Sequence, residues 1–152
     1  MSEVLELYER LRSLFGPEMD LAELEELAGE IARRLPKPVT RVVKMVNSIV
    51  EGALEVASSS VRGRLRELVV RGEAPNYRVR VYTDGIAKVD MSWGELSRVS
   101  QHLVALSAYT DEEGLYTFRV EDVSWAREMR VTVEADERVV LRNVVCIYDE
   151  YI

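Results

Sequence analysis

The sequence predicts a single-domain α+β protein, in which an N-terminal bundle of three to four helices precedes an antiparallel ββαβββ sheet. Apolar residues recur at helical spacing over residues 4–69. At Tyr77 the period changes to two, as in a strand with one buried face. The chain of 152 residues is 47% hydrophobic and can bury one core. We therefore expect one domain, 1–152, with a helical lobe at 1–74 and a β-rich lobe at 75–152.

The helical lobe is divided by turn and capping signals. Asp20 followed by Glu23 resembles a capping box, and Gly72 is typical of a helix end. The apolar stripe over 39–57 is too wide for a helix with one solvated side, which indicates a central or interface helix. The predicted helices are 2–15, 20–35, 39–57 and a basic one at 61–72. Whether the third and fourth are continuous stays open.

The β-rich lobe begins with a predicted hairpin of 77–82 and 86–91. A two-residue turn at Asp84-Gly85 would place Val81 opposite Lys88 and mix the two faces, so we expect a three-residue loop that pairs Val81 with Ala87. A capping box then predicts a helix over 92–110. Three further strands are expected at 115–120, 129–133 and 139–148, the last two joined by a loop at 135–137.

The composition indicates a heat-adapted intracellular protein. Arg outnumbers Lys by 17 to 3, and thermolabile side chains are rare. The one cysteine, Cys146, cannot form an intramolecular disulfide, and the N-terminus lacks the pattern of a signal peptide. No apolar stretch approaches the roughly 20 residues of a membrane span. We therefore expect a cytoplasmic location and no membrane partner.

No residue pattern predicts catalysis. His102 is the only histidine and has no recognisable acid or nucleophile to work with. One histidine and one cysteine leave only carboxylates for a metal, and those at Asp111-Glu112-Glu113 are typical of a solvated helix end. Asp84 superficially resembles the strand aspartate of ribonuclease H-like nucleases, but it fits a hairpin turn better. We expect a protein that is not an enzyme and has no cofactor or metal.

A basic stretch with nearby aromatic residues predicts binding of single-stranded nucleic acid. The net charge is −7, yet residues 61–80 carry six basic and two acidic groups. Arginine can pair with phosphates, and aromatic rings on an antiparallel sheet can stack unpaired bases. The candidate binding residues are Arg62, Arg66, Arg78, Arg80, Tyr82, Tyr116, Arg119, Trp125 and Arg127. A solvated sheet surface with heat-adapted arginines is the competing interpretation.

The strands at 77–82 and 116–119, with the overall makeup of the chain, resemble the ThermoDBP-related archaeal proteins. The resemblance implies a homo-oligomer from a thermophile that binds single-stranded DNA without catalysis. A second hypothesis is an assembly subunit of a larger complex, which would use the apolar face of the predicted third helix as its interface. Its coarse order of helices followed by a small β-region is shared with replication subunits such as those of the GINS complex.

Overall fold

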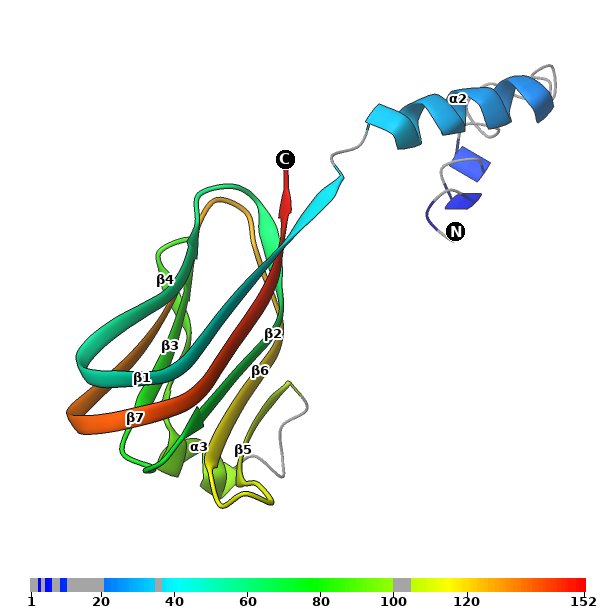
Figure 1. Ribbon diagram of the computed structural model, residues 1–152. Helices are drawn as coiled ribbons and strands as arrows, with labels where there is room; N and C mark the ends of the chain where they lie inside the picture. The colour runs from blue at the N-terminus through cyan, green and yellow to red at the C-terminus, as the bar shows by residue number, and fades with distance from the viewer. Residues whose placement is uncertain (1–2, 4, 7–8, 11–20, 35–36, 100–104) are drawn as a thin grey trace. The chain divides into compact units, whose positions relative to one another are not determined.

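The computed structural model describes residues 3, 5–6, 9–10, 21–34, 37–99 and 105–152, and it divides into two compact units (Figure 1). The units are Met1–Lys37 and Pro38–Ile152, so the division falls well before the expected boundary at 74/75. The predicted N-terminal bundle of three to four helices is wrong, because residues 38–72 contribute two strands to the sheet. The chain is mainly antiparallel β.

The first unit contains α2, Leu21–Arg34, which confirms the predicted second helix. Leu24 and Ala28 lie one turn apart and are both buried, as expected for the inward face of an amphipathic helix. The predicted first helix, 2–15, lies largely outside the described residues. Among those that the structure describes, no helix is long and apolar enough to cross a membrane.

In its described residues the second unit contains seven strands and one short helix, and all of these strand pairs are antiparallel. The elements are β1 Pro38–Ser59, β2 Gly63–Gly72, β3 Arg78–Thr83, β4 Ile86–Ser92, α3 Trp93–Val99, β5 Leu106–Thr110, β6 Tyr116–Trp125 and β7 Met129–Tyr151.

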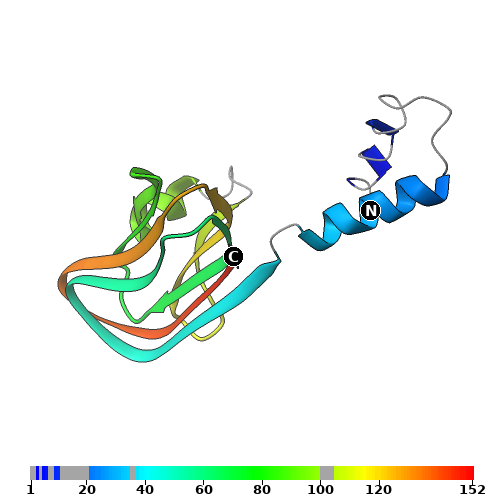
Figure 2. The same ribbon diagram turned by 90° about the horizontal axis from the view of Figure 1, so that it is seen from above.

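The long strand β7 organises this sheet. Along one edge it pairs with β1 over nearly its whole length, from Pro38 opposite Tyr151 to Ser59 opposite Met129. Its other edge pairs with β3 in the first part and with β2 in the second, which gives the order β4-β3-β7-β2-β6-β5. The β1–β7 pair bends between these two parts, so the sheet curls around its core (Figures 1 and 2).

The core fills the concave side of the curled sheet. The side chains that it buries completely come from the middle strands and include Leu65, Leu68, Val70, Val79, Val81, Phe118, Val120, Val131, Val133, Leu141, Val144 and Cys146. Fully burying each of the larger aliphatic or aromatic side chains contributes roughly 1.5–3 kcal/mol. One contiguous cluster therefore holds both parts of the sheet together.

The predicted third and fourth helices are strands β1 and β2. In β1, Val43 and Met45 pack on the core, but Val50 does so further along, so the inward face changes from odd to even positions. The change occurs around Asn47, whose φ is 52°. In β2 a bulge between Leu65 and Glu67 spaces the buried residues by three. Both irregularities imitate a helical period in the sequence.

The predicted hairpin forms, but its expected register is wrong. Val81 pairs with Val89 instead of Ala87, and Arg80 pairs with Asp90. The two-residue turn at Asp84-Gly85 is the one that forms, with φ values of 52° and 80°, as a type I′ turn requires. A bulge after Val81 restores the match of apolar faces that this turn would otherwise have lost.

The strand expected at 115–120 forms as the first half of β6, Tyr116–Trp125, whereas the other remaining elements depart from the prediction. Of the described residues in the expected helix 92–110, Trp93–Val99 form α3 and Leu106–Thr110 form β5. His102 lies outside the described residues. The strands expected at 129–133 and 139–148 are one continuous strand, β7. The order ββαβββ is therefore present from β3 to β7, with β5 lying in the expected helix and the last two expected strands joined into one.

Candidate functional site

Two of the predicted phosphate-binding residues lie within a cluster of carboxylates on β3 and its neighbours. Arg78 donates to Asp90 at 2.8 Å and to Glu95 at 2.6 Å. Arg80 donates to the same Asp90 at 3.1 Å and to Glu134 at 2.9 Å. The hydrogen bonds from Arg78 and Arg80 lower the pKa of Asp90. A nucleic-acid phosphate would have to displace these carboxylates, so little net attraction remains for it.

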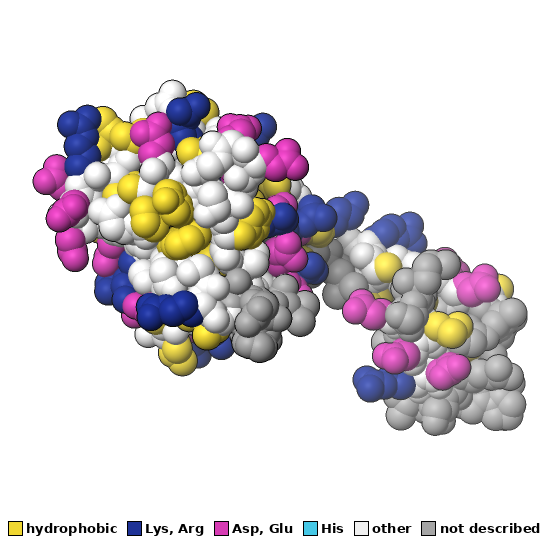
Figure 3. Space-filling model, turned by 90° about the horizontal axis from the view of Figure 1, so that it is seen from below, with side chains coloured by type: hydrophobic (Ala, Val, Ile, Leu, Met, Phe, Trp, Pro, Cys, Tyr) yellow, Lys and Arg dark blue, Asp and Glu magenta, His cyan; other side chains and the backbone are white. Residues whose placement is uncertain are grey.

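The same pairing holds for two more of the predicted cations. Arg119 donates to Glu67 at 2.6 Å and to Glu121 at 3.2 Å. Arg66 lies 3.7 Å from a carboxylate oxygen of Asp149. On the face of the larger unit shown in Figure 3, basic and acidic side chains are interspersed around the hydrophobic ones. The structure therefore does not gather these arginines into a basic patch.

Two of the predicted aromatic residues are held by contacts inside the fold. Trp125 is 3% exposed, and its ring nitrogen donates to the carbonyl oxygen of Val61 at 2.6 Å. Its predicted role in base stacking does not fit this position, because the ring lies in the core. Tyr116 is partly buried and packs edge-on against Trp93, with 4.9 Å between ring centroids.

The other predicted binding residues are Arg62, Tyr82 and Arg127. The guanidinium of Arg62 lies over the ring of Tyr151 at 5.2 Å, and Tyr82 is covered similarly by Arg130 at 4.9 Å. Arg127 is exposed. Within the described part of the chain, none of these three arginines has a carboxylate oxygen within 4.0 Å.

Neither the cysteine nor the serine–carboxylate pair of the described residues is activated as a nucleophile. Burial raises the pKa of the Cys146 thiol to about 12, so it is not a nucleophile at neutral pH. A cleft of about 610 Å³ is lined by Ser58–Ser60, Tyr82 and Arg130. Ser59 donates to Glu150 at 2.6 Å, a hydrogen bond that lowers the pKa of this carboxylate. Glu150 is thus a poor base for activating the hydroxyl, and no group of metal-binding side chains occurs in the described ranges.

The most unusual feature of the second unit is the outer edge of β1. This 22-residue strand pairs with β7 and with no other described strand, so its outer edge offers unpaired backbone groups. The apolar side chains along it are also exposed: Val39 by 38%, Val42 by 53%, Val46 by 66% and Ile49 by 52%. A long, apolar edge strand of this kind is a template for pairing with another chain.

The two halves of β1 differ in regularity. The first half, 38–46, pairs with β7 in one unbroken register. The second half is interrupted by the positive φ of Asn47 and of Gly52, and by register shifts at Val50/Gly52 and Glu55/Ala57. Only residues 38–46, which we call the N-terminal arm of β1, present a regular ladder that a further strand could extend.

The apolar surface continues from the N-terminal arm across the outer face of the sheet. Val42 pairs with Ile147, and the next outward position of β7, Val145, pairs with Lys44 on one side and Val69 on the other. Ile147, Val145 and Val69 are partly buried. Together with Val42 and Val46 they give five apolar side chains on the face that an added strand would extend.

The sequence contained a signal for this strand. Seven of the twelve residues 39–50 are Val, Ile or Thr, types that favour strands over helices. The same residues formed the stripe predicted as an interface. The prediction that these residues form a helix is wrong. Several of their apolar side chains are nevertheless exposed, as the interface hypothesis requires.

Comparisons with known proteins give no family. No family model matches the chain, and neither does any curated protein. Among solved structures, a crystal structure of FLHE is 12% identical and gives a TM-score of 0.35, over 76% of this chain and 98% of that one. Dimeric latent PorU from Porphyromonas gingivalis is 11% identical, with a TM-score of 0.26 over 77% of this chain and 11% of that one. Similarities this low support no argument about function.

Proposed function

We propose that this protein is a non-enzymatic interaction domain that binds an extended segment of a partner protein as an added strand on β1. The observation that carries the proposal is the unpaired outer edge of β1 together with its exposed valines. In strand addition, main-chain hydrogen bonds supply affinity and alternate side chains supply specificity. The proposal corresponds to an assembly subunit, with a sheet edge in place of the expected helix face.

The free energy available at the N-terminal arm is adequate for reversible binding. Complete burial of a valine contributes roughly 1.5–3 kcal/mol. Val42 and Val46 are 53% and 66% exposed, so covering them contributes about 1 kcal/mol or more each. Each added backbone hydrogen bond contributes about 1 kcal/mol net. Ordering the partner segment costs part of this sum, which indicates weak to moderate affinity.

The proposal can be tested by selecting binding peptides from a displayed library against the full chain. The selected peptides are then measured against a V42K/V46K double variant, in which the exposed valines of the arm become charged. I86K is the control for placing a lysine at an exposed apolar position elsewhere, because Ile86 is 62% exposed and lies on β4. We expect binding to the parent chain and to I86K, and loss of binding to V42K/V46K. Peptides that bind all three proteins equally would refute β1 as the site.

Single-stranded nucleic-acid binding remains a second candidate, carried by the cations without carboxylate partners. Arg62 and Arg130 each lie against a tyrosine ring, an arrangement that could hold phosphates beside stacked bases. Fluorescence anisotropy of labelled oligo-dT, a matching duplex and oligo-U at two salt concentrations tests it. Salt-sensitive binding to oligo-dT that R62A/R130A weakens would support this candidate. Absence of binding to all three would remove it.

A further inference from the structure

The outward face of the N-terminal arm has a definite chemical pattern. Val42, Lys44 and Val46 are successive exposed residues on one face of β1. The intervening Val43 and Met45 are partly buried against the core on the opposite face. The outer face of the arm therefore presents a cation between two exposed apolar side chains.

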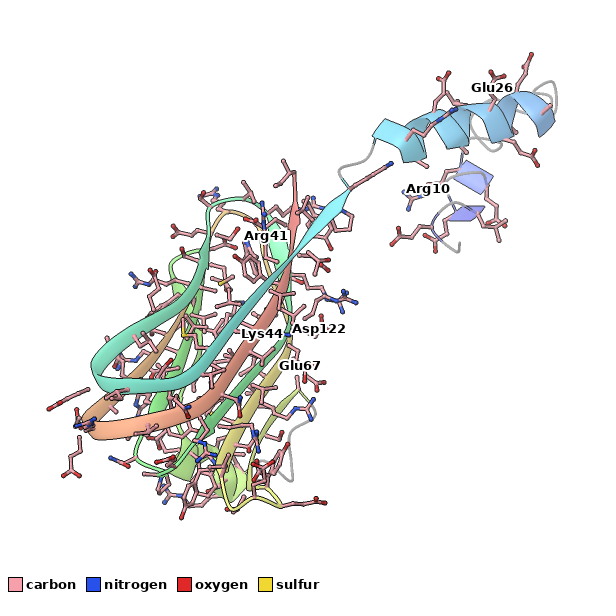
Figure 4. All side chains as sticks on the ribbon, in the orientation of Figure 1. Arg10, Glu26, Arg41, Lys44, Glu67 and Asp122 are labelled. Carbon is pink, nitrogen blue, oxygen red and sulfur yellow. The ribbon has the colours of Figure 1, made fainter. Side chains whose placement is uncertain are left out.

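The charge of Lys44 is not balanced by the fold. No carboxylate oxygen of the described residues lies within 4.0 Å of its amino group. Arg41, the other cation of the arm, is already paired with Glu150 at 2.8 Å. Between residues 38 and 50 the sequence has no Asp or Glu. Figure 4 labels Arg41 and Lys44 at their places along β1.

We propose that the partner segment carries an Asp or Glu opposite Lys44, flanked two residues away on each side by apolar residues. This inference rests on the proposed strand addition at β1. An apolar–x–acidic–x–apolar pattern would cover Val42 and Val46 while the carboxylate pairs with Lys44. Because the pattern reads the same in both directions, it holds for a parallel or an antiparallel added strand.

The same charges argue against a second copy of this chain as the occupant. Two N-terminal arms paired about a two-fold axis near Lys44 would bring the two Lys44 charges together, and neither has a carboxylate oxygen within 4.0 Å among the described residues. Like charges brought opposite each other destabilise a strand pair. Lysine on an edge strand is also a common feature that prevents self-association. A carboxylate on an acidic partner segment would instead attract Lys44.

The test uses three synthetic peptides that differ at one central position. They are Thr-Val-Thr-Glu-Thr-Val-Thr and its counterparts with Gln and with Lys at the centre. Each is titrated into the 15N-labelled full chain, and amide shifts of residues 39–46 report binding at the arm even when affinity is low. The proteins are the parent chain, K44E, V42K/V46K and the control K88E. Lys88 is also exposed and without a carboxylate in ion-pair range among the described residues, so K88E makes the same change of net charge on β4.

An exposed ion pair typically contributes 0.2–1 kcal/mol, so we expect the Glu peptide to bind about 1.4- to fivefold more tightly than the Gln peptide. The Lys peptide should bind more weakly still. K44E should reverse the order of the Glu and Lys peptides, whereas K88E should keep it. V42K/V46K should bind none of them.

The outcomes separate this inference from the proposed function. If all three peptides shift the arm equally, or if K44E keeps the original preference, strand addition stands and the acidic partner is refuted. If no peptide shifts the amides of the arm in any protein, both proposals fail. Sedimentation that shows dimers of the parent chain and monomers of V42K/V46K would replace the acidic partner with a second copy.

Discussion

Replacing Gly63 with Ala should destabilise the β-rich unit, because the position has no room for a side chain. A Cβ atom there would contact the carbonyl oxygen of Asp149 and would lie 2.5 Å from Cζ2 of Trp125. One of these contacts is backbone in the neighbouring strand, and the other is a buried ring held by its hydrogen bond to Val61. Neither can move far without disturbing the β2–β7 or β2–β6 pairing.

Overpacking of this kind costs roughly 1–3 kcal/mol. For a unit of about this size, each 1 kcal/mol lowers the Tm by about 4 °C, so G63A should melt about 4–12 °C below the parent chain. G94A is the control, since a Cβ atom at Gly94 would meet only Oγ of Ser92, at 4.0 Å. It should be neutral or stabilising by roughly 0.5–1 kcal/mol, because glycine is unfavourable in helices. Thermal and urea unfolding followed by circular dichroism measure both, and a G63A protein as stable as G94A would refute the packing derived for β2.

Two further predictions concern hydrogen bonds within the fold. Tyr77 is 2% exposed and donates its hydroxyl proton to the carbonyl oxygen of Tyr116 at 2.7 Å, so Y77F should lose about 1–2 kcal/mol in urea unfolding, whereas an unchanged midpoint would contradict this bond. The pKa of Asp84 is lowered by three backbone N–H groups, that of Asp90 by Arg78 and Arg80, and that of Glu150 by Ser59 and Arg41. Because these folded-state pKa values lie below the unfolded ones, the stabilisation is present above about pH 4–4.5 and is lost as pH falls through the folded values. Unfolding midpoints measured from pH 6 to pH 2.5 should fall, and D84N should fall less steeply than the parent chain.

The sequence predicted elements correctly where one local signal dominated. The amphipathic period and capping box were sufficient to predict α2, and the turn residues located the β3–β4 hairpin, although the two-residue turn that forms there was not the one predicted. The prediction failed where a strand contains an irregularity. The positive φ of Asn47 and the bulge at Leu65/Glu67 shift the buried positions of β1 and β2 by one residue, and a shifted alternation resembles a helix.

The predicted binding site depended on which side chains share a face and which partners they meet there. Sequence placed Arg80 on an exposed strand face, but the pairing of β3 with β7, which brings in Glu134, depends on contacts 54 residues apart. Trp125 is buried because it lies against Gly63 on a strand distant in sequence. Local pattern cannot determine either relation, since both arise from long-range strand pairing.

The irregular half of β1 and its regular half together limit how a partner could bind. A strand added along all of β1 would have to follow the bend and two register shifts between residues 50 and 57. The N-terminal arm of nine residues, at about 3.3 Å per residue, offers roughly 30 Å of continuous ladder. Within it, one lysine opposes self-pairing while the flanking valines remain exposed. The lysine disfavours pairing of two arms with each other but leaves the edge available to a different chain. A short acidic and apolar segment, rather than a second copy, is therefore the occupant that this arm favours.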